Sequence, residues 1–340
     1  MNTMPYKKCS ALMETLDNIT DSSGVLLVRA DLVERITKVW IEVLAASKIT
    51  TNHNERFEQM FRLLEDKMKK IQQLHVFSLP TADLKYFAVD IFPAMEVLKL
   101  DLCPPSTIKG IYTMRNVLTT LVITNSGITN LSRTLAPFKK RVLRTLSPMI
   151  FPDTINNIPQ KFLWSNLLTL KLSNCGISKI DESLHFFPSI EHLDLSHNTI
   201  SHIIHLQDCI DLKYVNFSYN RIRVLSNFER VIGSVTMINL AHNEVESLDG
   251  VDRILSLEKL DISYNRINDF GEIQVLCRLP NIEFIRLEGN PLALNAISNR
   301  HYRMNIFHAF IADGTIMNGN RPFPVLDGVP MTLKEKQFFK

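Results

Sequence analysis

The apolar positions in the second half of the chain recur in one fixed order. From Leu167 onward, six segments follow the pattern Leu-x-x-Leu-x-Leu-x-x-Asn-x-Leu, beginning with LLTLKLSNCGI and ending with IEFIRLEGNPL. The residues at the Asn position are Cys175, Asn198, Asn220, Asn243, Asn265 and Asn290, in steps of 23, 22, 23, 22 and 25 residues. A period of this length predicts a stack of similar units, each packed on its neighbours.

The alternation inside each segment predicts its local structure. The central Leu-x-Leu forms a short strand whose apolar side chains point into the stack, while the residues between them point outward. The Asn that follows can turn its amide onto backbone groups of the tight bend, and losing it costs about 1–3 kcal/mol where those groups are buried. These are the features of a leucine-rich repeat. The sequence therefore predicts an α/β solenoid of 22–23-residue repeats with a concave parallel β-sheet.

Two weaker copies of the pattern lie upstream. They are LTTLVITNSGI from Leu118 and MEVLKLDLC from Met95, with Ser126 and Cys103 at the Asn position. Together with the six later copies they predict eight strands. The step from Ser126 to Cys175 is 49 residues, so we expect one degenerate repeat or an insertion within 131–164. Small residues at the buried Asn position suit packing, which predicts structural roles for Cys103 and Cys175.

A solenoid needs caps over its two apolar ends, and the sequence supplies both. Residues 1–92 show no repeat, but apolar residues at helical spacing run from Leu32 to Leu44 and from Phe57 to Met68. They predict a helical N-terminal capping region. Residues 93–290 hold the repeats, and 291–340, with a helix over about 299–312, form the C-terminal cap.

Composition and charge narrow the class of protein. The 340 residues carry 38 Lys and Arg against 35 Asp and Glu, which is too balanced a charge for a nucleic-acid coat. The 5 cysteines have no paired spacing, which favours free thiols in a reducing compartment. The first residues lack the pattern of a secretory signal, and no apolar run is long enough to span a membrane. We therefore expect a cytoplasmic protein without a nucleic-acid partner.

Motifs of catalysis and cofactor binding are missing from the sequence. It contains no phosphate-binding glycine loop, nucleophile elbow or His-Glu-x-x-His segment, so we expect neither an enzyme nor a cofactor. One stretch imitates zinc-ligand spacing, with His202, His205 and Cys209 in HIIHLQDC. Both histidines fall between the apolar positions Ile200, Ile203 and Leu206, so exposure to solvent is the preferred interpretation.

The order of several segments resembles a known family. IFPAMEVLKL, IKGIYTMRNVLTTLVI, SNLLTLKLSNCGISKIDESLHFFPSIEHLDLSHN and LEGNPL are similar, in this order, to the N-terminal half of the serine/threonine kinase 11-interacting protein family, and more distantly to nischarin. GNPL, YRMNIF and VLDGVPMTLKE resemble the class typified by a regulatory subunit of protein phosphatase 1.

The first resemblance implies a scaffold that binds a serine/threonine kinase and influences its location, on endosomal or lysosomal membranes. The second leaves a phosphatase regulatory subunit as the alternative. The kinase-interacting family does not define its partner-binding surface by a short motif, so no residue role is carried over from it.

A binding surface can be sought among the outward-facing strand positions. The third residues of the last five repeats are large, and the fifth residues are polar, which is the composition of an interface hot spot. We expect partner contacts at His192, Asp194, Tyr214, Asn216, Met237, Asn239, Lys259, Asp261, Phe284 and Arg286. The column just before the Asn position, with His197, Tyr219, His242 and Tyr264, is more typical of framework.

A second candidate surface is electrostatic. Seven basic residues and no acidic one lie between Leu102 and Pro152. The densest group is Lys139, Lys140, Arg141 and Arg144. Such a cluster can bind an acidic partner or an anionic membrane at about 1 kcal/mol per charge. A solvated basic helix is the favoured alternative interpretation.

Overall fold

One parallel sheet runs the length of the repeats in the computed structural model, which describes residues 4–20, 24–49, 55–80, 84–129, 131, 135, 159–225, 228–294, 299–312 and 322–339. Within these residues the sheet has 11 strands, paired in chain order. They are β1 (Val25–Arg29), β2 (Gln73–Phe77), β4 (Val97–Asp101), β6 (Thr120–Thr124), β7 (Thr169–Ser173), β8 (His192–Asp194), β9 (Tyr214–Asn216), β10 (Met237–Asn239), β11 (Lys259–Asp261), β12 (Phe284–Arg286) and β13 (Val325–Leu326). The α/β solenoid expected from the repeat is thus confirmed.

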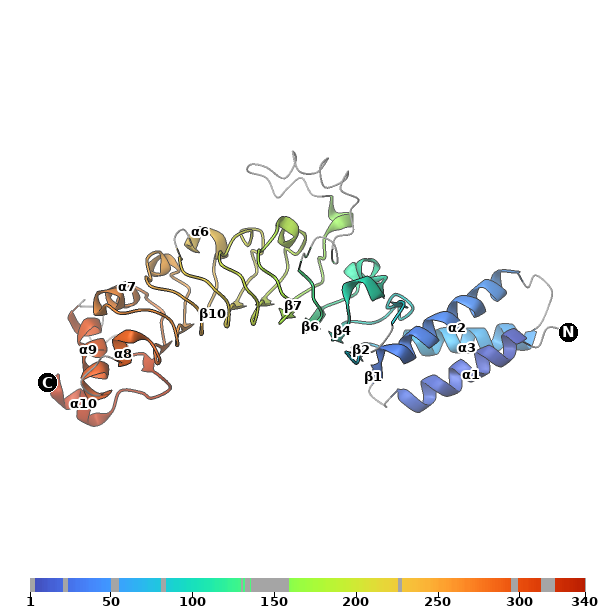
Figure 1. The fold of residues 1–340 in the computed structure, drawn as a ribbon, viewed down its shortest axis with the longest axis horizontal. Coiled ribbons are helices and arrows are strands. Elements are labelled where there is room, and N and C mark those ends of the chain that lie inside the picture. The colour runs from blue at the N-terminus through green and yellow to red at the C-terminus, as the bar shows by residue number, and fades with distance from the viewer. Residues whose placement is uncertain are drawn as a thin grey trace.

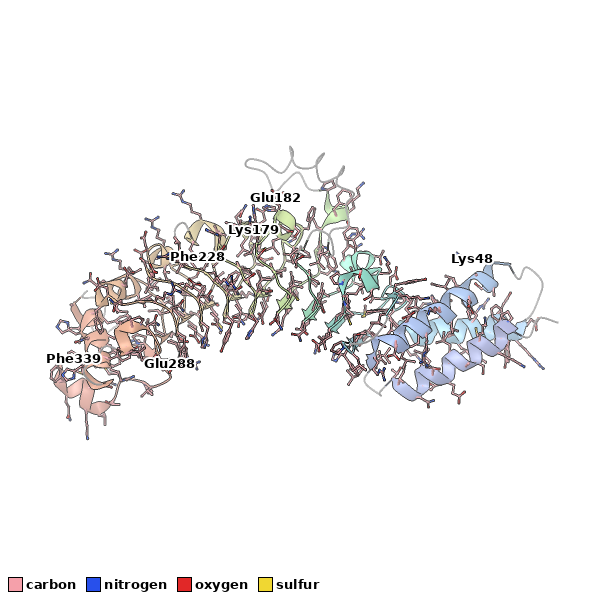
Figure 2. The ribbon with its side chains drawn as sticks, in the orientation of Figure 1. Lys48, Lys179, Glu182, Phe228, Glu288 and Phe339 are labelled. Atoms are coloured by element: carbon pink, nitrogen blue, oxygen red, sulfur yellow. The ribbon has the colours of Figure 1, made fainter. Side chains whose placement is uncertain are left out.

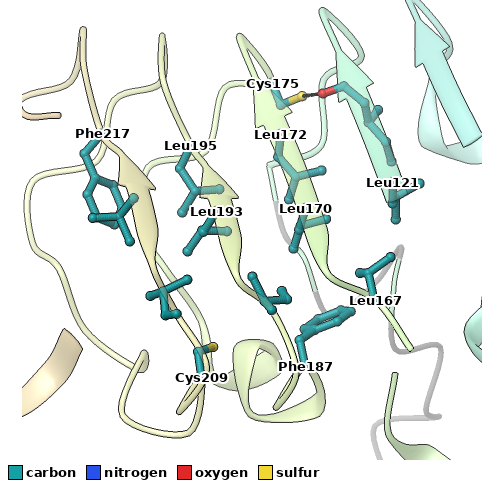
Figure 3. Close-up of a cluster of buried hydrophobic side chains, with 14 of the residues drawn as sticks. Leu121, Leu167, Leu170, Leu172, Cys175, Phe187, Leu193, Leu195, Cys209 and Phe217 are labelled. Carbon is teal, nitrogen blue, oxygen red and sulfur yellow. Dashed lines mark hydrogen bonds between the residues drawn. The ribbon is translucent and has the colours of Figure 1, made fainter. Parts of the chain in front are cut away.

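The strand register places equivalent residues of successive repeats side by side. Leu170 pairs with Leu193, which pairs with Val215, and all three are buried. Figure 3 shows Leu170 and Leu193 side by side, with Leu172, Leu195 and Phe217 in the next row and Leu167 and Phe187 near the other end of the strands. Alternation therefore divides each strand between an interior column and the outer face, as the Leu-x-Leu pattern predicts.

Strands β6 and β7 pair directly, although 49 residues separate their Asn-type positions. Because the two strands are neighbours in the sheet, no further repeat strand separates them. Where the chain returns, Trp164 is fully buried and its ring lies 5.5 Å from that of Phe187. Residues 132–134 and 136–158, which include Lys139, Lys140, Arg141 and Arg144, lie outside the described residues.

Three helices precede the repeats: α1 (Met4–Ile19), α2 (Ala30–Ile49) and α3 (Glu55–Lys69). Their buried faces include Leu16, Ile36 and Leu64, which join the same apolar core as the strands. The repeat pattern did not identify β1, which lies between α1 and α2, or β2, which follows α3, and both lengthen the sheet beyond the eight expected strands. Their short alternating runs, such as QLHVF, lack the Asn that marks the later repeats.

The C-terminal end is closed by α8 (Pro291–Leu294), α9 (Asn299–Ala312), β13 and α10 (Leu333–Phe338). Arg303 is buried and anchors this cap. Its Nε donates to Glu335 Oε1 at 2.7 Å, and its Nη1 donates to the Leu326 carbonyl at 3.0 Å. Asp327 accepts hydrogen bonds from the Tyr302 hydroxyl and from the Leu287 backbone, which ties α9 to the last full repeat.

Short helices connect the strands along the outer side of the arc. They are η1 (Pro105–Thr107), η2 (Ile111–Asn116), η4 (Gln160–Phe162), η5 (Glu182–Phe186), α6 (Phe228–Ile232), η6 (Val251–Arg253), η7 (Phe270–Glu272) and α7 (Ile273–Cys277), with a small sheet of β3 (Phe87–Ala88) and β5 (Ile108–Lys109). Because helices are wider than strands, the stack curves with the sheet on its inner, concave side (Figure 1). Lys179 and Glu182 lie on the opposite, convex side (Figure 2).

Candidate protein-binding surface

The strand register gathers the residues expected to contact a partner into two neighbouring rows on the concave face. One row contains His192, Tyr214, Met237, Lys259 and Phe284, which are paired in this order. The second row contains Asp194, Asn216, Asn239, Asp261 and Arg286, paired in the same way. All ten positions therefore lie on one face of five consecutive strands.

The first row forms a shallow hollow of about 300 Å³ between β9 and β12. Tyr214, Met237 and Phe284 line it together with Lys259, whose Nζ lies 5.2 Å from the centre of the Phe284 ring. Phe284 is 41% exposed, and Tyr214 is half-buried. Burial, followed by the carboxylates of Asp194 and Asp261, raises the pKa of Tyr214, so its hydroxyl stays protonated at neutral pH. This hollow combines apolar area, aromatic rings and a cation.

The second row has a framework role that the sequence argument missed. The side-chain oxygens of Asp194, Asn216, Asn239 and Asp261 each accept the backbone N–H two residues later. Such bonds fix the turn that ends each strand. The recurring Asp or Asn two residues before Ser or Ala is the signal that could have revealed this role.

Asp194 illustrates why a carboxylate of the second row stays ionised although it is partly buried. Burial alone would favour the protonated carboxyl, but hydrogen bonds from Lys171 and Ser196 lower the pKa of Asp194 below its usual value. The Lys171 ammonium lies 2.8 Å from Asp194 Oδ2. Asp261 likewise lies 3.6 Å from the Arg286 guanidinium. These carboxylates therefore present little uncompensated negative charge to a partner.

The column of His197, Tyr219, His242 and Tyr264 forms a continuous ladder of stacked rings. Successive ring centres are 4.2, 4.1 and 4.3 Å apart, and the planes are within 12° of parallel. Each of the four residues has a φ between 55° and 57°. Because the ring faces are used to stack on one another, the ladder holds the turns in register rather than presenting free faces.

The Asn-type positions bind adjacent repeats through hydrogen bonds. Asn243 Nδ2 donates to the carbonyls of Phe217 and Leu240, while its Oδ1 accepts from the Ile222 N–H. Asn198, Asn220, Asn265 and Asn290 bond in the same manner. Each of these side chains is buried and meets groups of two repeats, so the column is part of the framework.

Cysteines replace Asn in two of the repeats. The Cys175 Sγ donates to the Ile123 carbonyl at 3.4 Å, as Figure 3 shows. Burial raises the pKa of Cys103 to about 12 and also raises the pKa of Cys175. Both thiols therefore stay protonated at neutral pH, which makes them poor nucleophiles and poor metal ligands.

The stretch that imitates zinc spacing does not assemble a metal site. Among the described residues, no group of three or more His, Cys, Asp or Glu side chains lies close enough to hold a metal ion. His202 is exposed, as expected, but His205 is partly buried, with its ring 5.6 Å from that of His185. The expectation that His205 faces solvent was wrong in this respect. His185 is in turn paired with buried Asp208.

No helix within the described ranges is long and apolar enough to cross a membrane.

Comparisons with known proteins return leucine-rich-repeat proteins. The family described as Leucine Rich Repeat matches residues 189–208. The structure of internalin C2 from Listeria monocytogenes is 16% identical, covering 66% of this chain and 83% of that one at a TM-score of 0.46. An internalin of the same organism is 13% identical, covering 69% and 61% at 0.42. A leucine-rich-repeat protein of Leptospira interrogans is 17% identical, covering 73% and 61% at 0.45.

Proposed function

We propose that this chain is a non-enzymatic scaffold that binds a protein partner through the concave face of its repeats. Leucine-rich-repeat proteins typically mediate protein–protein interactions, and an extended concave sheet offers a continuous surface for this purpose. The proposed contact residues are those of the hollow, which Arg286 also lines, together with His192 on the neighbouring strand β8. The partner is a serine/threonine kinase, whose location or activity the scaffold influences in the cytoplasm.

The hollow formed by Tyr214, Met237, Lys259 and Phe284 carries this proposal. Exposed aromatic and Met side chains beside a cation have the composition of hot spots, where a few residues supply most of the binding energy. The choice of a kinase rests on the ordered resemblance of segments such as IFPAMEVLKL to the kinase-interacting family. A phosphatase catalytic subunit is the second candidate, supported by the resemblance of the C-terminal cap segments.

The test is affinity purification from cell extract with mass spectrometry, comparing the intact chain with a variant carrying His192→Ala, Tyr214→Ala and Phe284→Ala. Because each hot-spot side chain contributes about 2 kcal/mol or more, we expect at least tenfold weaker retention of a kinase by the variant. The matched control carries Ile210→Ala and Leu255→Ala, two exposed apolar residues outside the strands.

Loss of a kinase from the triple variant alone would support the proposal, whereas loss of a phosphatase catalytic subunit would favour the alternative. Equal retention of every partner by the intact chain and the triple variant would refute the concave-face site. Thermal unfolding of each variant verifies that the fold is retained before binding is compared.

We also propose that the basic cluster Lys139, Lys140, Arg141 and Arg144 supports peripheral attachment to anionic membranes such as those of endosomes or lysosomes. Charge reversal at the first three residues should reduce co-sedimentation with liposomes containing phosphatidylserine, because each charge contributes about 1 kcal/mol. Liposomes of phosphatidylcholine alone provide the control. Unchanged sedimentation with the anionic liposomes would remove the membrane role and leave the concave-face proposal intact.

A further inference from the structure

A second apolar hollow lies on the same concave face, near its N-terminal end. It measures about 230 Å³ and is lined by residues of β1, β2, β4 and β6, among them Leu27, Phe77, Lys99 and Val122. Leu27 is 65% exposed and Phe77 37% exposed, so both apolar side chains are accessible. None of these residues is among the ten expected partner contacts, which lie on the last five repeats.

The two hollows share the same chemistry. Each one combines apolar side chains, a partly exposed phenylalanine and a lysine: Phe77 with Lys99, and Phe284 with Lys259. Neither lysine has an ion pair among those formed by the described residues, and both are in reach of solvent. Burial, then the neighbouring Lys99 charge, lowers the pKa of His75, so this side chain is neutral at pH 7 and does not add a second cation.

The acidic side chains on this face are engaged within the protein. Asp101, beside the N-terminal hollow, accepts hydrogen bonds from the Thr124 hydroxyl at 2.6 Å and the Asn125 amide at 2.7 Å. Asp261, beside the C-terminal hollow, accepts from Ser263 and faces Arg286. The Thr124 and Asn125 donors are neutral, so Asp101 keeps its negative charge beside Lys99, whereas Arg286 compensates Asp261. Lys99 and Lys259 are complementary to carboxylates on a partner, because neither ammonium group forms an ion pair among the described residues.

The surface between the two hollows is polar. Thr120 and Thr169 occupy one row, and the ion pair of Lys171 with Asp194 occupies the next. Lys99 on β4 and Lys259 on β11 are six strands apart in the sheet, which corresponds to about 29 Å along it. A straight helix laid across the curved sheet contacts it at both ends and leaves a gap in the middle. Apolar hollows at the two ends and a hydrated polar surface between them fit such a helix.

The width of the face also fits a single helix. Strands β1 to β7 of the sheet are five residues long, and β8 to β12 are three residues long. At about 3.3 Å per residue the face is roughly 7–13 Å wide, close to the 10–12 Å diameter of a helix with its side chains.

We propose that the two hollows together bind one amphipathic helix of about 26 residues, with an apolar anchor near each end and a carboxylate inside each anchor, since Phe77 on β2 and Phe284 on β12 are eight strands apart, about 38 Å. This inference rests on the proposed function, because the helix belongs to the protein partner bound by the concave face. Phe77 and Phe284 receive the two apolar anchors, and Lys99 and Lys259 face the two carboxylates.

Photo-crosslinking tests the arrangement. The chain is prepared with p-benzoylphenylalanine in place of Phe77, of Phe284, or of Leu255 as a control outside the strands, and is irradiated in cell extract. We expect the Phe77 and Phe284 positions to crosslink the same protein, at segments about 26 residues apart in its sequence. The Leu255 control should not crosslink either segment.

The outcomes separate this inference from the proposed function. Crosslinks from Phe284 alone, or to two different proteins, or to segments with an unrelated spacing, would overturn the single-helix arrangement and leave the concave-face scaffold standing. Crosslinks no different from the Leu255 control at both positions would overturn both. A shared partner that is neither kinase nor phosphatase, with the expected spacing, would support the helix and refute the proposed class of partner.

A synthetic peptide covering the crosslinked segments provides the second measurement. Its affinity should fall about fivefold for Lys99→Glu and about fivefold for Lys259→Glu, as for partly exposed charge pairs at an interface. Lys179→Glu, on the convex side in Figure 2, serves as the matched control and should leave the affinity unchanged. Insensitivity to charge reversal at Lys99 would refute the N-terminal contact, even where Lys259 matters.

Discussion

One backbone position in each repeat adopts the left-handed conformation at the turn that ends the strand. Its occupants are Leu102, Asn125, Asn174, His197, Tyr219, His242, Tyr264 and Gly289, with φ between 52° and 74°. This region is costly for residues with a Cβ, by about 1–2 kcal/mol. The stacked rings offset this cost across neighbouring repeats, as does the hydrogen bond of 2.6 Å that the Asn174 side-chain amide donates to Asn125 Oδ1. The glycine ends the column because the Tyr264 ring packs directly on its backbone.

The packing of Tyr264 on Gly289 makes a prediction for Gly289→Ala. A Cβ at Gly289 would lie 2.5 Å from the Tyr264 ring, whereas a Cβ at Gly127 would meet nothing within 4 Å. Both glycines have positive φ, at 74° and 65°, so both alanine variants incur similar backbone strain. Displacing the ring should make Gly289→Ala about 1 kcal/mol more destabilising than Gly127→Ala, judged from the energy of aromatic pairs. Thermal unfolding measures the difference, and equal losses would show that the ring contact contributes nothing.

The residue scale also shows what the sequence could not reveal. The Asn-type column was predictable because its spacing is regular and its amide satisfies buried backbone groups. The bond from Asp194 to the Ser196 N–H was missed because a polar residue on an outward-facing position is equally typical of a binding surface. Only the geometry distinguishes a side chain turned onto its own backbone from one that is free to contact a partner.

At the scale of elements, the repeat pattern predicts strands where an Asn follows them and misses strands where none does. The runs VLLVR and QLHVF alternate like the others, with Leu26, Val28, Leu74 and Val76 buried, yet they lie among helical segments. Runs of 5 residues are too short to outweigh that context. The N-terminal hollow is completed by Leu27 and Phe77 on these two strands, so the repeat pattern could locate only the part of it on β4 and β6. The division into 1–92, 93–290 and 291–340 stays a prediction.

At the scale of the whole molecule, the curvature and the length of the solenoid are the sums of similar contributions from each repeat. Each repeat contributes one strand and a wider connection on the convex side, and pairing in chain order accumulates the same small rotation at every step. The sequence predicts this arc from period alone. It does not predict that the face narrows from five-residue to three-residue strands after β7, because the Leu-x-Leu core is the same in both groups. The shape available to a partner therefore depends on strand ends, which the motif leaves undefined.

The stacked architecture also predicts how far a destabilising substitution in the C-terminal cap affects the other strands of the sheet. Arg303→Met removes a buried guanidinium and leaves the carboxylate of Glu335 without its partner, a change that costs about 3–5 kcal/mol. Because each repeat contacts only its neighbours, the loss should loosen β13 and β12 first and leave β4 to β7 protected. Hydrogen exchange measures this as faster exchange confined to the C-terminal strands. Arg278→Met, which removes the exposed guanidinium paired with partly buried Asp252, is the matched control and should change little. Faster exchange spread evenly from β4 to β12 would mean that the solenoid unfolds as one cooperative unit, and the cap would then stabilise the whole face rather than its end.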